Sequence, residues 1–412
     1  MNLFGTLYCR TAQFITNKIA MPMVYFPEPK KITGPGCLAN IPSLLKDGHY
    51  LCPFVMMGKH FEHSPDGLRF LEALKEIYPE VVTFDEVPPN PTVDAVYAAY
   101  YVAKKSNCDA IVAIGGGSVL DAAKIVGALL TNPRRPLTKM KGVLKIRHRL
   151  PLFIAVPTTA GTGSEATVAA VITDSKTHDK FAISDPHLIP KIAVLDDTLL
   201  TSLPPSLIAS TGMDALTHAV EAYLGHALTK KTASYALQSV RLIHDNLLAF
   251  YQDPRNETAR KNMQEASYLA GVAFTRSYVG YVHAIAHSLG GAYNVPHGYA
   301  NAIILPHVLR AYGKKAEKKL ARLSDVAKLT AYDESREKKA QAFLSWIEEA
   351  NKAMGIPTQF QGVIQAKDIP ALARHAAKEA NPFYPVPKEL SAKQLEAIYQ
   401  ELDTYDSRNK AN

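Results

Sequence analysis

Long apolar runs are what this sequence most clearly lacks. The longest, such as Cys108–Gly117 and Pro151–Pro157, fall well short of the roughly 20 residues that a helix needs to cross a bilayer. No segment joins a charged start to an apolar stretch and a small-residue cleavage site, which is the pattern of an export signal. We therefore expect a soluble chain in the cytoplasm, with no membrane insertion.

Cysteine is also scarce. The 412 residues contain four cysteines, all within the first third of the chain: Cys9, Cys37, Cys52 and Cys108. None has the spacing of a CxxC metal site, and so few thiols in so long a chain argue against a disulfide-stapled scaffold. This composition fits a reducing compartment.

Acidic residues are missing between Asp121 and Glu165, where eight lysines and arginines accumulate within a chain of net charge +8. Aromatic side chains do not alternate with these cations, as a platform for nucleic acid would require, so nucleic acid is not an expected partner. A solvated basic face is the simpler interpretation, and attraction of a phosphate group is the alternative.

The length and the 47% apolar content exceed what one hydrophobic core usually organises, so we expect two domains. In the first half, short β-rich runs alternate with helical ones, which predicts a parallel sheet covered on both faces. A hairpin, with strands at Thr167–Thr173 and Phe181–Ser184 around the polar turn Asp174–Asp179, is expected to be added to this sheet. The other expected strands are Phe54–Met57, Val81–Phe84, Ala110–Ile114, Leu152–Val156 and Ile192–Leu195, and the helices are Ser64–Ile77, Val93–Ser106 and Val119–Thr131.

From Pro204 onward the β-branched runs disappear and apolar residues recur at helical spacing. The sequence therefore predicts an α/β dinucleotide-binding domain over residues 26–203 and an all-helical metal and catalytic domain over residues 204–412. Residues 1–25 are expected to form a helical extension that packs on the body, rather than a membrane-surface or transit segment. The expected helices of the second half are Ser206–Leu224, Thr229–Tyr251, Glu257–Phe274, Gly280–Tyr293, Lys314–Leu329, Lys338–Met354 and Ser391–Leu402.

Two turns rich in glycine and threonine follow predicted strands. Gly115–Ser118 leads from a strand into a helix, with Asp121 placed three residues after Ser118 as in a capping box. Glycines let the backbone approach a pyrophosphate, and the N–H groups at a helix start attract it. The second turn lies within Pro157–Glu165, also after a strand, where open α/β sheets place their ligands. The spacing is not GxGxxG, so a plain tight turn is the alternative for either one alone.

In the helical half, Asp214 and His218 lie four residues apart, which puts a carboxylate and an imidazole on one helix face. His283 and His287 repeat this spacing, and His297 follows at a Pro-His-Gly turn. A carboxylate with several imidazoles suits a divalent metal such as Fe²⁺ or Zn²⁺. The alternative for any one of these histidines is a packed polar residue.

Taken in order, five stretches resemble the successive signatures of the iron-dependent (group III) alcohol dehydrogenase family. The resemblance covers about residue 26 to the C-terminus. It implies a nucleotide-binding domain followed by a helical metal domain, an oxidoreductase that moves hydride between NAD(P) and a primary or small alcohol or aldehyde, and a homodimer. The five stretches are Gly115–Lys124, Pro157–Glu165, Gly212–Tyr223 (GMDALTHAVEAY), His283–Gly290 (HAIAHSLG) and Asn294–Pro306 (NVPHGYANAIILP).

The resemblance also implies roles for single residues. The metal ligands, for Fe²⁺ or Zn²⁺, would be Asp214, His218, His283 and His297. His287 is similar to the family's catalytic or proton-relay histidine, and Phe274 to a residue that lines the substrate pocket. The family's cofactor contacts would fall on Asn90, Gly116, Gly117, Ser118, Asp121, Thr158, Thr159, Thr162, Lys180 and Leu199.

Gly58 departs from the commonest family pattern. Many members that prefer NAD have an aspartate here, which accepts hydrogen bonds from the adenosine ribose. Without that carboxylate a 2′-phosphate meets no repulsion, and Lys59 or His60 can pair with it, so we expect NADP to be accepted. The alternative is that Gly58 merely ends a strand and that either cofactor is used.

Two other functions remain open at this point. A glycerol-dehydrogenase or dehydroquinate-synthase type zinc enzyme of the same fold would hold its metal with one carboxylate and two histidines, and His218 favours the alcohol dehydrogenase because it supplies a fourth ligand. A non-catalytic regulator that binds nucleotide or metal through the basic stretch Lys139–Arg149 is the alternative of another class.

Overall fold

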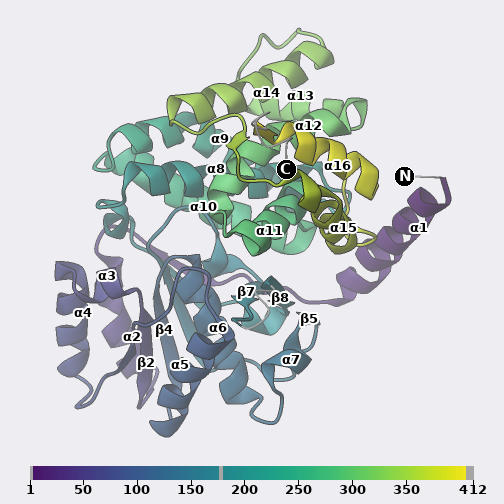
Figure 1. Ribbon diagram of the computed structural model, residues 1–412. Helices are drawn as coiled ribbons and strands as arrows, with labels where there is room; N and C mark the ends of the chain where they lie inside the picture. The colour runs from purple at the N-terminus through teal and green to yellow at the C-terminus, as the bar shows by residue number, and fades with distance from the viewer. Residues whose placement is uncertain (1–2, 176–179, 405–412) are drawn as a thin grey trace. The chain divides into compact units, whose positions relative to one another are not determined.

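The computed structural model describes residues 3–175 and 180–404. The chain divides into two compact units, one made of residues 25–203 and the other of residues 1–24 and 204–412. The first unit is built of alternating strands and helices, and the second is mainly helical (Figure 1). In these described ranges, no helix is both long and apolar enough to cross a membrane.

The first unit is organised around a parallel sheet. Its order across the described residues is β1-β9-β6-β4-β2-β3, and every neighbouring pair is parallel. The sequence predicted all of these strands except the edge strand β1, whose residues are mostly exposed. The strands are β1 (Lys30–Thr33), β2 (Pro53–Met57), β3 (Val82–Phe84), β4 (Ala110–Gly115), β6 (Leu152–Pro157) and β9 (Ile192–Leu195).

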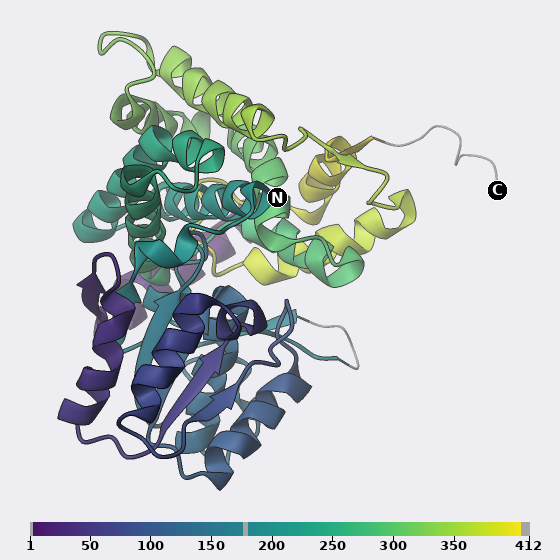
Figure 2. The ribbon, with the colours of Figure 1, turned by 90° about the vertical axis from the view of Figure 1, so that its left-hand side faces the viewer.

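Successive side chains of the central strands enter two different cores, one on each face of the sheet. On β4, Ile111 packs with α5 (Val93–Lys105) and α6 (Gly117–Thr131), whereas Val112 packs with α2 (Ile41–Asp47) and α4 (Pro65–Lys75). Both cores are apolar and closed to solvent, which explains why these strands are continuous apolar runs. Figure 2 shows the purple and blue helices of this unit around its strands.

The predicted hairpin forms, but it is not part of the large sheet. β7 (Ala169–Thr173) and β8 (Lys180–Ser184) pair antiparallel. Among the described residues, β8 also pairs with the two-residue strand β5 (Gly142–Val143), so the hairpin belongs to a separate sheet of order β5-β8-β7. The expectation that it extends the main sheet was wrong. β8 pairs instead with β5, which lies 41 positions earlier in the chain, and no local sequence pattern indicates this pairing. Residues 176–179 of the predicted turn lie outside the described residues.

The second unit contains all seven helices expected there and two that the sequence did not predict. The seven are α8 (Pro205–Leu224), α9 (Lys230–Gln252), α10 (Glu257–Ser277), α11 (Tyr281–Tyr293), α13 (Lys314–Ala327), α14 (Arg336–Ala353) and α16 (Ala392–Glu401). The others are α12 (His297–Tyr312), which has Pro306 in its interior, and α15 (Ile369–Ala380). The unit is not entirely helical, since β10 (Phe360–Gln361) and β11 (Asp403–Thr404) form a short parallel pair.

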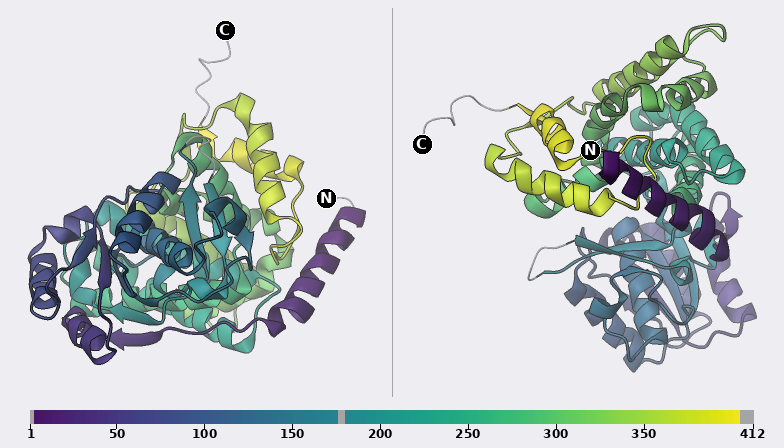
Figure 3. Two further views of the ribbon diagram at one scale, coloured as in Figure 1. Left: turned by 90° about the horizontal axis from the view of Figure 1, so that it is seen from below. Right: turned by 90° about the vertical axis from the view of Figure 1, so that its right-hand side faces the viewer.

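The N-terminal helix α1 (Leu3–Phe14) packs within the helical unit. Arg10 donates to the carbonyl oxygens of Val386 and Pro387 and pairs with the buried carboxylate of Glu389 at 2.6 Å. The Gln13 amide donates to the carbonyl oxygen of Tyr384 at 2.8 Å. Figure 3 (right) shows α1 in purple beside the yellow segment that carries these partners. One face of the helix is therefore anchored by polar contacts.

Candidate active site

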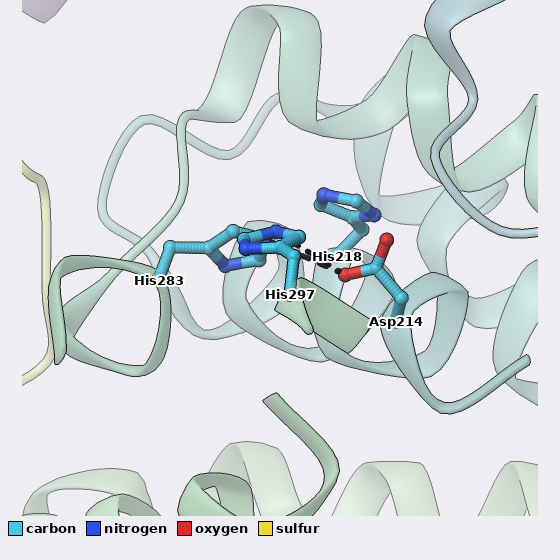
Figure 4. A group of neighbouring side chains, drawn as sticks. All are labelled: Asp214, His218, His283 and His297. Carbon is cyan, nitrogen blue, oxygen red and sulfur yellow. Dashed lines mark ion pairs between the residues drawn. The ribbon is translucent and has the colours of Figure 1, made fainter. Parts of the chain in front are cut away.

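Three helices of the second unit bring a carboxylate and three imidazoles together (Figure 4). Asp214 and His218 come from successive turns of α8, His283 from the first turn of α11, and His297 is the first residue of α12. One ligand atom from each residue lies within 4.8 Å of the other three. Asp214, His218 and His283 are buried, and the His297 side chain is one third exposed.

The close approach of α12 to α8 depends on Gly298. A Cβ atom at this position would lie 2.4 Å from the carbonyl oxygen of Ser210 and 3.3 Å from the Cβ atom of Asp214. Any larger residue would push the start of α12 away from α8, because backbone cannot yield to such a contact. The glycine after His297 therefore sets the distance between His297 and Asp214.

The donor set converges on one point. Asp214 Oδ1 lies 3.6 Å from His297 Nε2 and 4.0 Å from His283 Nε2. The Asn301 amide nitrogen lies 2.7 Å from the same Asp214 oxygen, 3.1 Å from His297 Nε2 and 3.4 Å from His283 Nε2. Three potential ligand atoms, one each from α8, α11 and α12, thus lie around a single point. This is the arrangement that a divalent cation requires, and a carboxylate with imidazoles is a donor set for Fe²⁺ or Zn²⁺.

Glu221 orients one of these imidazoles. Its Oε2 atom lies 2.6 Å from His283 Nδ1, and the carboxylate also accepts hydrogen bonds from the backbone N–H groups of Gly280 and Val282 at 2.8 Å each. Burial raises the pKa of Glu221 to about 7, and these hydrogen bonds oppose the rise. Burial, together with the neighbouring imidazoles, keeps the pKa of His283 well below its usual range. A neutral His283 donates Nδ1–H to Glu221 and leaves Nε2 as the ligand atom.

His287 lies one helical turn after His283 but outside the group of four. Its ring stacks on that of His297, with centroids 5.2 Å apart. Its Nδ1 atom lies 2.7 Å from Glu379 Oε1, which also accepts a hydrogen bond from the Tyr384 hydroxyl at 2.9 Å. Burial alone would raise the pKa of Glu379, but the charge and hydrogen bond of His287 and the Tyr384 hydroxyl outweigh it and lower this pKa. His287 therefore has a carboxylate partner on one side and the group of four on the other.

Phe274, on α10, is also brought to this group. Its ring stacks on that of His218, with centroids 4.2 Å apart and an angle of 13° between the planes. The side chain is half-buried. An aromatic ring beside the donor set provides an apolar wall next to the point where the ligand atoms meet.

In the first unit, the two glycine-containing turns meet at the carboxyl edge of the sheet. Gly116 precedes α6 as its N-cap, and a Cβ atom on Gly117 would lie 2.7 Å from Thr162 Cγ2. Thr159 is 3.5 Å from the corresponding position on Gly116, and Thr158 N–H donates to the carbonyl oxygen of Gly115. The glycines therefore let the second turn lie against the start of α6.

Asn90, Ser118 and Lys180 form a second polar group in this unit. The Lys180 ammonium donates to Asn90 Oδ1 at 2.8 Å, and the Asn90 N–H donates to Ser118 Oγ at 3.3 Å. Asn90 has φ of 59°, a left-handed conformation that asparagine tolerates better than most residues. Burial lowers the pKa of Lys180. Three residues predicted from distant parts of the sequence are therefore in direct contact.

Asp121 does not form the predicted capping box. The helix begins two residues earlier than expected, with Gly116 as its N-cap and no side-chain cap. The two oxygens of Asp121 accept hydrogen bonds from Ser164 Oγ at 2.6 Å and from the N–H of Val171 at 2.9 Å. Asp121 thus ties α6 to the second turn and to β7.

The remaining predicted cofactor positions follow the ends of strands. Gly58 is the N-cap of α3 (Lys59–Glu62) directly after β2, and Lys59 is exposed. Leu199 lies in a 3-10 turn after β9 and packs against one of the two cores. Because these strands are parallel, Gly58, the two turns and Leu199 all follow carboxyl ends at the same edge of the sheet.

Sequence reasoning missed Glu221, Asn301 and Glu379. Glu221 had a signal, because it lies seven residues after Asp214 and so on the same face of α8. Asn301 had a similar one, four residues after His297. Glu379 had none, since it is 92 positions from His287 and only the packing of α15 brings it close.

Known proteins resemble this chain over both units. A family model described as iron-containing alcohol dehydrogenase matches residues 28–197, and a model of the C-terminal part of the same family matches residues 208–402. Alcohol dehydrogenase 4 of Schizosaccharomyces pombe is 38% identical over 384 residues, which cover 92% of this chain and 90% of that protein. The 1,3-propanediol dehydrogenase of Citrobacter freundii is 38% identical over 332 residues, covering 80% and 85% of the two chains.

A solved structure extends the likeness to the fold. The crystal structure of a 1,3-propanediol oxidoreductase matches with a TM-score of 0.87 and 32% identity, over 92% of this chain and 100% of that chain. The two family models together match both units, and the relatives share this identity over most of the chain. The chain belongs to the iron-containing alcohol dehydrogenase family.

Proposed function

We propose that this oxidoreductase holds a divalent cation, Fe²⁺ or Zn²⁺, on Asp214, His218, His283 and His297, and interconverts a small primary alcohol and its aldehyde with a nicotinamide cofactor. The observation that carries the proposal is the convergence of these four ligand atoms within 4.8 Å. Such a cation supplies Lewis acidity, which lowers the pKa of an alcohol and polarises a carbonyl.

The protein's own part is to hold its ligands in the correct form. Glu221 accepts the Nδ1 proton of His283 and so keeps the Nε2 lone pair directed at the site. Asn301 reaches Asp214 Oδ1 with its amide and restricts the carboxylate to one orientation. The Glu221 contact thus fixes the tautomer and the orientation of His283 before any ion binds.

His287 is the proposed proton carrier. In alcohol oxidation the hydroxyl proton has to leave the buried site, and in aldehyde reduction a proton has to enter it. The Nδ1 contact with Glu379 leaves Nε2 of His287 on the side of the ring away from the carboxylate. Glu379 can stabilise the imidazolium that forms while the proton is held.

The cofactor is proposed to bind at the carboxyl edge of the parallel sheet. The start of α6 and the turn around Thr158, Thr159 and Thr162 would hold the pyrophosphate, and the Asn90, Ser118 and Lys180 group lies at the same edge. The relatives include both an NAD-dependent methanol dehydrogenase and an NADPH-dependent butanol dehydrogenase, so the fold serves either cofactor. Gly58 leads us to propose that NADP is accepted here.

The position of Phe274 bears on the size of the substrate. Phe274 stacks on His218 and would restrict the space for the substrate beside the donor set, which favours a short alcohol.

A homodimer is proposed from the family resemblance. A cytoplasmic location is proposed because the cysteines, all in the described residues, are free thiols.

One experiment separates this function from its rivals. Purified protein is analysed for bound metal and assayed for oxidation of NADH and NADPH with a series of short aldehydes, and in parallel with glycerol and NAD⁺. The proposal predicts near one equivalent of metal per chain and turnover of aldehydes. Preference for glycerol would favour the zinc polyol enzyme, and bound nucleotide without turnover of either class would favour a regulator.

A further inference from the structure

Two cysteines that the proposed function does not use are in contact. The Sγ atoms of Cys52 and Cys108 lie 3.5 Å apart. Cys52 immediately precedes β2 and Cys108 lies two residues before β4, and these two strands are neighbours. The other two thiols, Cys9 and Cys37, are buried elsewhere. Contact between two thiols at adjacent strand ends is the arrangement from which a disulfide forms.

Ideal strand geometry gives the two backbones the separation that a disulfide needs. Pro53 is paired with Ala110, and the Asp109 N–H donates to the carbonyl oxygen of Cys52, so the ladder continues to Cys52 with Cys108 displaced by one residue. Neighbouring strands about 4.8 Å apart, with a rise of about 3.3 Å per residue, give a Cα separation of about 5.8 Å. This value falls within the roughly 4.4–6.8 Å typical of disulfides. Rotation of the two cysteine side chains is therefore enough to bring their sulfur atoms to bonding distance.

The site is held in place and reachable. The Asp109 carboxylate accepts hydrogen bonds from the N–H groups of Leu51 and Cys52, which fixes the backbone next to one thiol. Cys52 and Cys108 are both half-buried rather than enclosed. A hollow of about 360 Å³ adjoins Cys108, and its lining includes Lys104 and Asn107, a cation and an amide that suit a small anionic peptide.

We propose that Cys52 and Cys108 are a thiol modification site, at which a low-molecular-weight disulfide of the glutathione type converts the pair to an internal disulfide. Cys52 loses its proton to solvent and attacks one sulfur of the small disulfide as a thiolate, which forms a mixed disulfide and releases one small thiolate that takes up a proton from solvent. Cys108 then loses its proton to solvent and attacks the Cys52 sulfur, which releases the second small thiolate. Two protein thiols are oxidised and one small disulfide is reduced to two thiols.

The order of the steps follows from the surroundings. Burial, with Cys52 beside it, raises the pKa of Cys108 above the range of an ordinary thiol, so Cys108 stays protonated during the first exchange. The Cys52 thiol lies 3.3 Å from the carbonyl oxygen of Ser106, and its sulfur stays 3.5 Å from that of Cys108. Once Cys52 carries the leaving group, Cys108 is the nearest nucleophile.

The test counts thiols and does not depend on enzymatic activity. The reduced full-length protein is incubated with oxidised glutathione, quenched with acid, unfolded and labelled with a maleimide, and its peptides are mapped by mass spectrometry. We expect two of the four thiols to be lost, no glutathione to be retained, and one linked peptide pair that contains Cys52 and Cys108. Dithiothreitol should restore all four thiols.

Variants distinguish this site from general oxidation. Cys108→Ser should retain one glutathione on Cys52, because the second step has no nucleophile, and Cys37→Ser should form the internal disulfide as the parent does. Alanine replaces serine if a serine variant does not fold. The proposal is overturned if the parent keeps four thiols, if glutathione stays bound to it, or if the linked peptides contain Cys9 or Cys37.

Discussion

His287 Nδ1 lies 2.7 Å from Glu379 Oε1, and the same carboxylate oxygen accepts a hydrogen bond from the Tyr384 hydroxyl. The contact joins α11 to the end of α15, and the two residues are 92 positions apart in the sequence. A histidine whose Nδ1–H is held by a carboxylate presents Nε2 in a fixed direction. Glu379 is therefore a positioning residue for the proposed proton carrier.

Glu379→Gln should lower kcat without loss of metal. The amide keeps the shape and can still accept the Nδ1 proton, but it removes the charge that stabilises the imidazolium. A hydrogen bond to a charged group contributes about 1.5–3 kcal/mol, so kcat should fall roughly 10- to 100-fold with KM for the aldehyde little changed. Glu349→Gln, an exposed site on α14, is the matched control. Equal activity of the two variants would leave Glu379 with a packing role only.

His287→Ala should keep its metal and lose rate. A proton carrier contributes about 10²–10⁴-fold to a rate, so kcat should fall within that range and its dependence on pH should change. Steady-state kinetics from pH 6 to 10 with elemental analysis of the same sample measure both effects. Loss of the metal from this variant would instead make His287 a ligand.

His283→Ala should lose both metal and turnover. The change removes one of four ligand atoms and also leaves the buried Glu221 carboxylate without its imidazole partner. His244→Ala, at a partly exposed histidine of α9, controls for the loss of an imidazole elsewhere in the same unit. Full metal occupancy in His283→Ala would remove His283 from the site.

Gly58→Asp should shift cofactor preference from NADP(H) toward NAD(H). A Cβ atom at Gly58 meets no heavy atom within 4 Å, so the side chain fits without displacing its surroundings. If the carboxylate and a 2′-phosphate lay ~4–5 Å apart at an effective dielectric constant near 20, repulsion would be on the order of 3–4 kcal/mol per unit charge, which is two or more decades in preference. kcat/KM for both cofactors is the measurement.

Gly58→Asn is the control for that prediction, because it has the same size without the charge. The ratio of the two kcat/KM values should move much less in Gly58→Asn than in Gly58→Asp. A parent that strongly prefers NAD(H), or equal ratios in all three proteins, would mean that the 2′ position is read by other residues.

The sequence predicted those parts of the fold whose signal is local. β4 and β6 are buried on both faces and therefore read as apolar runs, whereas β1 is an edge strand with two lysines and gives no such pattern. α12 was missed because Pro306 lies inside it, although most of the helix is buried and its packing holds the helix together. The hairpin was assigned to the wrong sheet because its pairing with β5 is long-range.

In the candidate site, too, the sequence predicted the features that have a local signal and missed those that depend on long-range packing. The i, i+4 spacing of Asp214 and His218 predicted two side chains on one face, and the structure brings them together with His283 and His297. The capping box at Ser118 and Asp121 was wrong, because the tertiary contacts of Asp121 with Ser164 and Val171 take its oxygens instead. No spacing rule could have found Glu379, which depends on how α15 packs.

The central claim is that catalysis depends on a cation held by Asp214, His218, His283 and His297. The direct measurement is aldehyde reduction by one protein sample before treatment with a metal chelator, after the chelator has been removed, and after addition of Fe²⁺ or Zn²⁺ without oxygen. We predict that activity falls in proportion to the metal lost and returns as about one equivalent of metal rebinds per chain, while His283→Ala recovers neither metal nor activity. Full turnover by protein from which all metal has been removed would contradict the account.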